Sequence, residues 1–237
     1  MEVLFSFKER LFQGALLSFE LSIYSLILSL IIGAVVCLAQ MSERRIFRYP
    51  ANIYSTFMRG VPDLVQLFLI FYGGQYLLNY LGKTYAWKNL EMTPFTTGVI
   101  ALALIFGAYM AEAFRGGFMA IPKGQIEAAK AFGLSPWHIF WRISRPQMLR
   151  YALPSLGNNW LVLMKSSSLV SIIGLQDLVY VASASAKSMQ RKDIYAAFWF
   201  YGAIAAFYLL LTTISILILW YLQRRYGQGF EQEQSNA

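Results

Sequence analysis

The feature that most constrains this chain is a series of five apolar stretches, each long enough to cross a lipid bilayer. A membrane-spanning helix needs roughly 20 mostly apolar residues. Charged residues make up only 14% of the chain, against about 25% in soluble domains. Since lipid offers backbone groups no hydrogen-bond partners, each crossing must satisfy its own backbone, as a helix does. We therefore predict an all-α, polytopic membrane protein, a five-span helical bundle that forms a single transmembrane domain over 1–237, with spans near 16–39, 62–81, 95–110, 153–181 and 194–222.

Basic residues are distributed unevenly between the segments that connect these spans. With five spans, the two ends of the chain lie on opposite sides of the membrane. The segments 40–61, 111–152 and 223–237 hold more Lys and Arg than the segments that alternate with them. Because basic segments favour the cytoplasmic side, we expect an N-terminus outside, a cytoplasmic C-terminus and a long cytoplasmic loop at 111–152. This distribution accounts for the net charge of +8 without a nucleic-acid partner.

Several kinds of site are excluded by the residues that the sequence lacks. Cys37 is the only cysteine and His138 the only histidine, which excludes an intrachain disulfide, a cysteine metal cluster and a multi-histidine site. The sequence has no GxxxxGK[ST] phosphate loop, so the chain cannot itself be an ATPase. We expect no catalytic residue, metal or cofactor in this chain. The sequence also shows no internal duplication of the kind found in secondary carriers.

The loop at 111–152 carries helix signals rather than those of a structureless connector. Pro122 fits the first position of a helix, and Gly133 fits the left-handed residue that ends it. Ser135 followed by a proline fits the cap and first turn of a second short helix, which should stop near Pro146. The loop is therefore expected to form a helix, a tight glycine turn and another helix.

The first helix of this loop has a surface that another backbone can approach closely, because it carries small residues at Ala128, Ala129 and Ala131. Ile126, Ala129 and Lys130 share one face of it. Two interpretations stay open from physical chemistry alone. The helix either protrudes into a groove on a partner protein or rests on the membrane surface.

The same helix resembles a known signature. Glu127-Ala128-Ala129, then Gly133, and later Leu153-Pro154 resemble the EAA signature in the cytoplasmic loop of bacterial ATP-binding-cassette (ABC) importer permeases. Two further segments are similar to the polar amino acid uptake branch of that family, namely MRGVPDLVQLFLIFYG at 58–73 and NNWLVLMKSSSL at 158–169. Within this branch, the chain is most similar to Q-type subunits of histidine, lysine, arginine and ornithine permeases, and octopine and nopaline permeases are also similar.

This resemblance implies a multi-subunit importer in the bacterial inner membrane. Its coupling helix, here with Glu127, Ala128, Ala129 and Gly133, plugs into an ATP-binding subunit. The implied partners are a second related permease subunit, two ATP-binding subunits that hold ATP and Mg, and a soluble substrate-binding protein outside. The cargo would be a basic or polar amino acid, or an opine. An ion-coupled secondary carrier and a purely structural membrane subunit are the alternatives from other classes.

Asp63 and Gln66 are candidates for substrate contacts. Charged groups at membrane depth usually face the bundle interior or water, and Gln66 lies three residues after Asp63 on the same helical face. Relative to the family that the chain resembles, Asp63 stands where a neutral residue is usual, which points to cationic ligands. The alternative is that Asp63 lies at the inner interface and forms an ion pair with Arg59.

Lys165 and Ser168 belong to a polar run that interrupts the fourth predicted span. Lys165 could receive a substrate carboxylate, and we include Ser168 among the candidate substrate contacts. Such small polar residues more often bond neighbouring helices than ligands. Lys165 could also pair with Glu112, and the sequence does not decide between these roles.

Overall fold

The structure is a computed structural model that describes residues 7–85, 91–189 and 194–227. This described part consists of helices and short connections and contains no strand, so the predicted all-α class is confirmed. Its α-helices are α2 (Lys8–Gln40), α3 (Arg45–Gly60), α4 (Asp63–Phe68), α5 (Gly74–Tyr85), α6 (Pro94–Met119), α7 (Lys123–Ala131), α8 (Pro136–Ile139), α9 (Arg145–Ser166), α10 (Leu178–Met189) and α11 (Ala196–Gly227). Leu69–Gly73 and Phe140–Ser144 are π-helical, and Ser167–Ile173 is a 3₁₀-helix.

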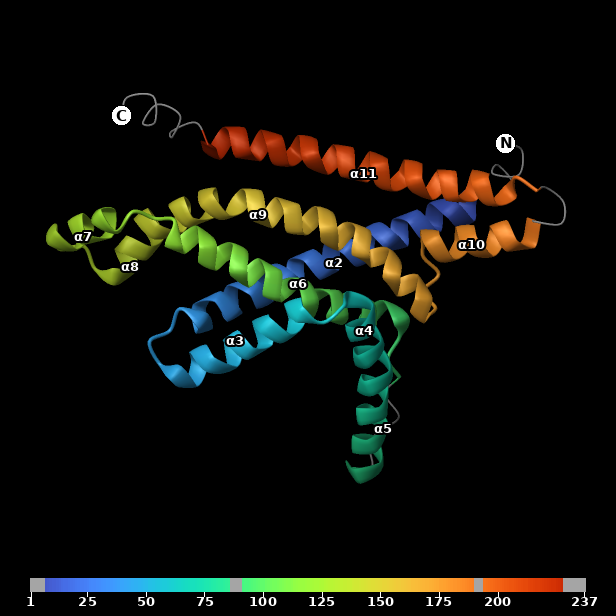
Figure 1. Ribbon diagram of the computed structural model, residues 1–237, viewed down its shortest axis with the longest axis horizontal. Coiled ribbons are helices and arrows are strands. Elements are labelled where there is room, and N and C mark those ends of the chain that lie inside the picture. Colours follow the sequence, from blue (N-terminus) through green and yellow to red (C-terminus); the bar gives the residue numbers. More distant parts are fainter. Residues whose placement is uncertain (1–6, 86–90, 190–193, 228–237) are drawn as a thin grey trace.

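Within this part of the chain, four helical segments are long and apolar enough to cross a membrane, namely α2, Asp63–Thr84, α6 and α11. A fifth crossing arises if Pro136–Ile173 and α10, which meet at a bend of 53°, are counted as one. Helices α2, α6, α9 and α11 run along the long axis of the molecule (Figure 1). The chain is therefore a polytopic helical membrane protein, as predicted.

Helix α6 is longer than the predicted third span. The prediction of 95–110 stopped at a polar run, but the helix continues to Met119. The charged side chains in that run pair with each other, since Arg115 Nη2 lies 2.6 Å from Glu112 Oε2 one helical turn away. Because this pairing keeps the polar run helical, the loop predicted to begin at 111 begins only after α6.

The fourth crossing differs from the prediction in its start and in its course. The expectation that a short helix stops near Pro146 is wrong, because Pro146 lies in the first turn of α9, where its missing N–H is not needed. The helix therefore runs from the loop directly into the membrane segment. After Ser166 the backbone tightens into the 3₁₀-helix and then turns at Gly174, whose φ of 95° is left-handed. The predicted single span over 153–181 is thus broken before α10.

Helix α6 lies at the centre of the bundle and α2 packs along it. In the most apolar window of α6, 72% of residues are buried. Small residues allow this close contact, since a Cβ on Gly33 would lie 2.5 Å from Met110 Cβ, and one on Gly107 would lie 2.6 Å from Ile32 Cγ2. Small residues are typical of helix contacts in membranes. Glycines therefore allow α2 and α6 to approach each other closely at this contact.

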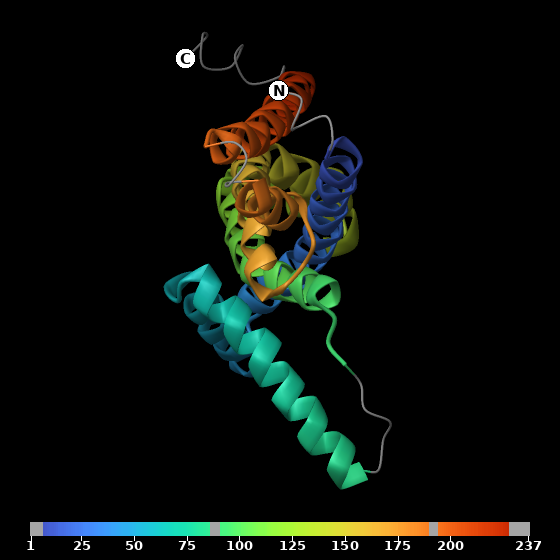
Figure 2. The ribbon, with the colours of Figure 1, turned by 90° about the vertical axis from the view of Figure 1, so that its right-hand side faces the viewer.

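Two parts of the bundle, the segment with α4 and α5 and helix α11, leave most of their surface uncovered. Figure 2 shows α4 and α5 extending away from the bundle as an arm. Only 11% of the most apolar window in Asp63–Thr84 is buried, and none of that in α11. Helix α11 contacts α9 where Trp160 Nε1 donates to Ser215 Oγ at 3.1 Å. These apolar surfaces are available to lipid or to another membrane subunit.

Candidate functional site

Asp63 lies beside two interruptions of the helical path, one between α3 and α4 and the other at the end of α9. Pro62 has an extended conformation that separates α3 from α4, so Asp63 is the first residue of α4. Its half-buried carboxylate accepts a hydrogen bond from Ser166 Oγ at 3.4 Å. Ser166 is the last residue of α9, just before the 3₁₀-helix. The structure therefore brings Asp63 next to the polar run of the fourth crossing, although these segments are far apart in the sequence.

The position of Asp63 argues against an inner-interface role. Helix α9 has 22 residues and begins at the loop, so its far end lies about 33 Å from that loop. Asp63 contacts this far end. Arg59, the ion-pair partner considered for Asp63, instead lies 3.4 Å from Glu112 Oε1. The alternative of an Asp63–Arg59 pair is therefore wrong.

Gln66 stabilises the turn before Asp63. Its buried Nε2 donates to Met58 O at 2.8 Å and to Val61 O at 2.6 Å. These carbonyls lie at the end of α3, where the last backbone carbonyls of a helix have no N–H partner within the helix. The side-chain amide thus holds the chain reversal that positions Asp63. Its Oε1 is buried and makes no hydrogen bond to the described residues.

Lys165 and Ser168 flank Ser166 but have different surroundings. Ser168 Oγ donates to Lys165 O at 2.7 Å and so supports the start of the 3₁₀-helix. The Lys165 side chain is exposed and forms no ion pair with any described residue. The alternative of a Lys165–Glu112 pair is wrong, because the ion-pair partners of Glu112 are Arg59 and Arg115.

Glu112 connects three helices, a role that sequence reasoning missed. Its Oε1 accepts from Gln40 Nε2 on α2 and Ser55 Oγ on α3, each at 3.2 Å, and from Arg59 on α3. Its Oε2 accepts from Arg115 Nε at 3.0 Å and Nη2 at 2.6 Å. The sequence did contain a signal for this role. It is a carboxylate followed one helical turn later by an arginine, within an apolar helix. We name Glu112 with these four donors the Glu112 cluster.

The loop contains the predicted helix and glycine turn. Helix α7 follows Pro122 and ends before Gly133, whose φ of 74° confirms the predicted left-handed residue. The turn is closed by hydrogen bonds from Gly133 N to Lys130 O at 2.9 Å and from Leu134 N to Ala129 O at 3.1 Å. Helix α7 lies at one extreme end of the molecule (Figure 1).

The two faces of α7 are used differently. Ala129 is only 4% exposed, and Ile126 packs against the buried cluster that contains Met148 of α9. The face with Ala129 therefore contacts this chain, which corrects the expectation that Ala129 offers a free docking surface. Glu127 and Ala128 are exposed. These residues and the end of the helix remain accessible to a partner.

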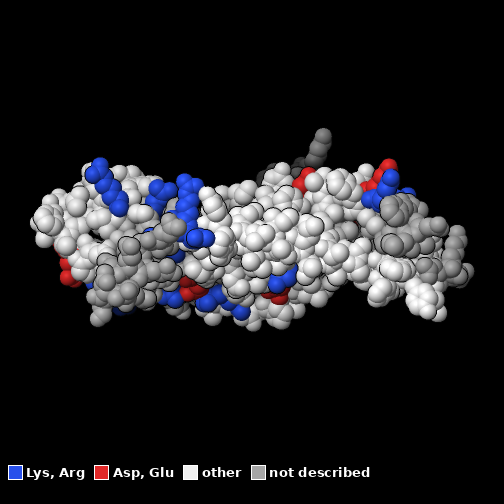
Figure 3. All heavy atoms as spheres, turned by 90° about the horizontal axis from the view of Figure 1, so that it is seen from above, with Lys and Arg blue, Asp and Glu red and all other residues white. Residues whose placement is uncertain are grey.

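Basic side chains gather toward the end of the molecule that holds α7 and α8, with a smaller group at the other end (Figure 3). Arg145 lies over the Trp141 ring, with Cζ 4.6 Å from the ring centroid. This charge distribution is consistent with the basic loop seen in the sequence.

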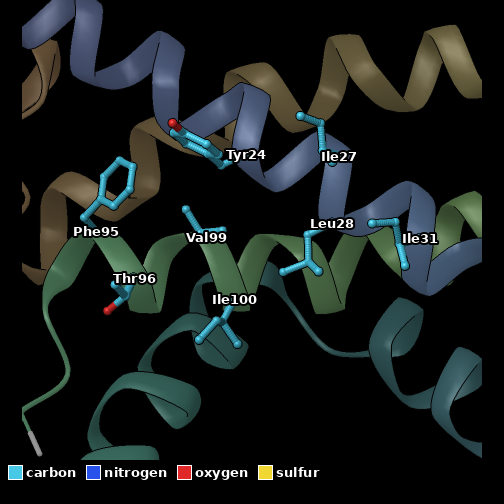
Figure 4. A pocket seen from close by; sticks show the side chains of 8 residues that line it. All are labelled: Tyr24, Ile27, Leu28, Ile31, Phe95, Thr96, Val99 and Ile100. Carbon is cyan, nitrogen blue, oxygen red and sulfur yellow. The ribbon is translucent and has the colours of Figure 1, made fainter.

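An apolar groove of about 440 Å³ between α2 and α6 is a poor candidate for binding a charged substrate. Figure 4 shows its lining side chains, which come from both helices and include no charged group. Tyr24 and Thr96 are the lining residues with polar side chains. An ammonium or guanidinium group would lose its hydration there without gaining a charged partner.

The chain is similar over almost its whole length to known transport proteins. The family described as "Binding-protein-dependent transport system inner membrane component" matches residues 18–228. The histidine/lysine/arginine/ornithine transport system permease protein HisQ of Escherichia coli (strain K12) is 42% identical over 97% of this chain and 99% of its own length. The arginine ABC transporter permease protein ArtQ of Haemophilus influenzae is 35% identical over 93% of this chain and 95% of its own length.

Solved structures show the same fold. A crystal structure of an amino acid ABC transporter with histidines matches with a TM-score of 0.78 and 30% identity, covering 94% of this chain and 96% of that one. The MetNI methionine ABC transporter matches in fold alone, with a TM-score of 0.65 at 13% identity. The chain therefore belongs to the family of inner membrane components of binding-protein-dependent transport systems, and it is a transport subunit rather than an enzyme.

Proposed function

We propose that this chain is one of the two transmembrane subunits of an ABC importer that moves basic L-amino acids, of the histidine, arginine, lysine and ornithine class, into the cytoplasm. The observation that carries the substrate class is the carboxylate of Asp63 at the far end of α9, beside a break in the crossing helix. A carboxylate at membrane depth can pair with a guanidinium or ammonium group. Relatives named for basic amino acids support the same class. Opines and other polar amino acids are the second candidates.

The importer would contain a second related permease subunit, two ATP-binding subunits and a soluble substrate-binding protein. The ATP-binding subunits would hold ATP and Mg, since this chain has no phosphate loop. Glu127, Ala128 and the Gly133 turn would contact one of them. Their exposure at the extreme end of the molecule supports this assignment. Ala129 would act from the buried face of α7, by packing this helix against the rest of the chain.

Movement of α7 would reach the space beside Asp63 through α9. Gln147 Nε2 of α9 donates to Gln125 Oε1 of α7 at 2.5 Å, and Ile126 packs on the cluster around Met148. The other end of α9 lies beside Asp63, to which Ser166 Oγ donates at 3.4 Å. A displacement of α7 on closure of the ATP-binding subunits would therefore move both ends of one helix. Lys165 and Ser168, beside this contact, are candidate secondary contacts of the substrate.

The coupling assignment predicts that bulk on the exposed face of α7 separates the subunits. Ala128→Arg should reduce the amount of ATP-binding subunit that copurifies with a tagged chain, and substrate-stimulated ATP hydrolysis should fall with it. Ala184→Arg places the same side chain at an exposed position on α10, at the other end of the molecule, and should leave copurification unchanged. Normal association of the Ala128→Arg chain would mean that α7 does not dock on an ATPase.

The orientation that we propose, with the N-terminus outside and the C-terminus cytoplasmic, follows from the basic segments. In a Cys37→Ser background, Ser42→Cys and Ser135→Cys should be shielded from a membrane-impermeant thiol reagent in intact cells. Ser188→Cys should react, because Ser188 belongs to the last turn of α10, and α10 lies at the opposite end of the molecule from α8, which Ser135 precedes (Figure 1). Labelling in the reverse pattern would invert the topology and remove the basis for the coupling assignment.

A further inference from the structure

Two uncovered surfaces of the bundle carry different side chains. They belong to helix α11 and to the arm formed by α4 and α5, and both segments are long and apolar enough to cross a membrane. Figures 1 and 2 show them on opposite sides of the bundle. Since lipid and protein favour different side chains at the surface of a helix, the residues of each surface indicate what covers it.

The side chains of α11 follow the pattern of a helix that faces lipid. Tyr201 and Trp220 are exposed and nineteen residues apart, or about 28 Å along the helix, which is close to the roughly 30 Å hydrocarbon layer. Aromatic side chains at both ends of such a stretch are typical of the two membrane interfaces. Thr213, an exposed residue between them, donates its hydroxyl to Leu209 O of the same helix at 2.8 Å. The large exposed side chains between the two aromatic ends are aliphatic, namely Leu209, Leu210, Ile214, Ile216, Leu217 and Ile218.

The arm shows the opposite pattern. Its exposed face carries Tyr72, Tyr76 and Tyr80, which are 61%, 75% and 61% exposed and follow one another at intervals of four residues. Tyr72 and Tyr76 lie near the middle of the segment Asp63–Thr84, where a crossing helix meets the hydrocarbon layer. Within the described part of the chain, none of the three phenol hydroxyls forms a hydrogen bond. Because a hydroxyl without a partner is costly in hydrocarbon, these tyrosines indicate that protein covers this face.

We propose that the tyrosine face of the arm, defined by Tyr72, Tyr76 and Tyr80, packs against the second, related permease subunit of the importer. This inference rests on the proposed function, which supplies that subunit. A neighbouring helix can provide the hydrogen-bond groups that lipid lacks. Gly73 lies beside the tyrosines, and a Cβ on it would meet no atom within 4 Å, so another helix can approach the backbone closely there.

The size of the face suits a stable interface. An aromatic side chain buries about 150–250 Å², so the exposed parts of three tyrosines offer roughly 300–500 Å². Leu69 and Leu77, which are also exposed, extend this area toward the roughly 800 Å² per partner of a standard interface. The arm begins at Asp63, the proposed substrate contact. A second subunit that covers the arm would therefore lie next to the substrate site.

Other occupants fit this face less well. Lipid tails would leave the three phenol hydroxyls without partners, whereas they suit the aliphatic surface of α11. The ATP-binding subunits and the substrate-binding protein are soluble, so they cannot reach the middle of a segment that crosses the membrane. The second permease subunit combines a location in the membrane with polar groups, so the side chains of the arm favour it.

Photo-crosslinking from the Tyr76 site tests this contact in the complete importer, expressed with its partner subunits. The photo-reactive amino acid p-benzoylphenylalanine replaces Tyr76 in one chain. In a control chain it replaces Leu210, which is exposed in the centre of α11. Irradiation in native membranes should join the first chain to the second permease subunit and the control chain to no protein. Mass spectrometry of peptides from the product identifies the partner.

Substitutions at Tyr76 test the same contact without photochemistry. Tyr76→Ala should weaken the association of the two permease subunits roughly thirtyfold, as expected for a central aromatic residue of an interface. Tyr76→Phe keeps the ring and loses the hydroxyl, so it should weaken the association about fivefold. Leu210→Ala should leave it unchanged. The readout is the fraction of the chain that retains the second subunit over a dilution series in detergent.

The outcomes separate this inference from the proposed function. A chain that copurifies with neither an ATP-binding subunit nor a second permease subunit would contradict the proposed function itself. If both subunits copurify, a product with lipid alone at the Tyr76 site would overturn only the inference. So would a product with a soluble subunit or with a second copy of this chain, or protein products of equal yield at the Tyr76 and Leu210 sites. Equal association in the wild type and the Tyr76→Ala chain would overturn it as well.

Discussion

Replacing Glu112 by glutamine should destabilise the contact between α2, α3 and α6. Glu112→Gln keeps the size of the side chain and one acceptor oxygen but turns the other oxygen into an amide donor. In the native structure both oxygens accept, Oε1 from Gln40, Ser55 and Arg59 and Oε2 from Arg115. Whichever way the glutamine amide is turned, its NH₂ group faces donors. At least one set of these hydrogen bonds must therefore be lost.

The expected cost follows from the geometry. A hydrogen bond to a charged group contributes about 1.5–3 kcal/mol, whereas a solvent-exposed ion pair contributes at most about 1 kcal/mol. The Glu112 side chain is 20% exposed and the arginines about 40%, so water can partly replace the lost partners. We expect a loss of about 2 kcal/mol in the free energy of unfolding. This corresponds to roughly a thirtyfold change in the unfolding equilibrium constant.

Equilibrium unfolding in mixed detergent micelles, followed by helix content, measures this loss. Glu43→Gln makes the same chemical change at an exposed residue between α2 and α3, and should alter the free energy of unfolding by less than about 0.5 kcal/mol. A double-mutant cycle adds a finer test. Glu112 should couple more strongly to Arg115, which donates twice to one oxygen, than to Arg59 at 3.4 Å. Equal stability of the two glutamine variants would refute the role given to the Glu112 cluster.

Asp63→Asn should weaken recognition of arginine and lysine by about 1–3 kcal/mol, roughly 5- to 150-fold, and that of a neutral analogue much less. The readout is ligand-stimulated ATP hydrolysis by the whole transporter, and equal losses for charged and neutral ligands would make Asp63 a structural residue. Gly14→Ala should cost about 1–3 kcal/mol of stability, because its Cβ would lie 2.9 Å from Leu178 N and 3.0 Å from Asp177 O. Gly202→Ala meets no atom within 4 Å and serves as control, so comparable losses in both would contradict the close contact between α2 and α10.

The predictions that succeeded rest on local signals. Apolar length identified the crossing helices because the bilayer sets a minimum that few soluble helices reach. The glycine turn after α7 was predictable because a residue without a Cβ is favoured where φ is positive, as at Gly133. The preference for serine just before a helix identified Ser135 as the residue before α8. Each of these features depends on a few consecutive residues.

The predictions that failed depended on partners distant in the sequence. The role of Glu112 was missed because, apart from Arg115 one turn later, its partners lie 53 to 72 residues away, on α2 and α3. Ala129 was assigned to a free face because nothing local shows that α7 packs against α9. The two backbone acceptors of Gln66 were equally hidden in the sequence, and its contact with substrate stays a prediction. The position of Asp63 was ambiguous for the same reason.

The strengths of these contacts bear on how Asp63 would move during transport. Only Val61 and Pro62 separate Asp63 from α3. Helix α3 is held to α6 by Ser55 and Arg59 through the Glu112 cluster. The contact of Asp63 with α9 is a single long hydrogen bond of 3.4 Å from Ser166. When α6 and α9 shift relative to each other, the weaker contact should give way first, since one long neutral donor is worth less than several donors on a carboxylate. Asp63 would then travel with α6, and the movement of α9 would open or close the space beside its carboxylate.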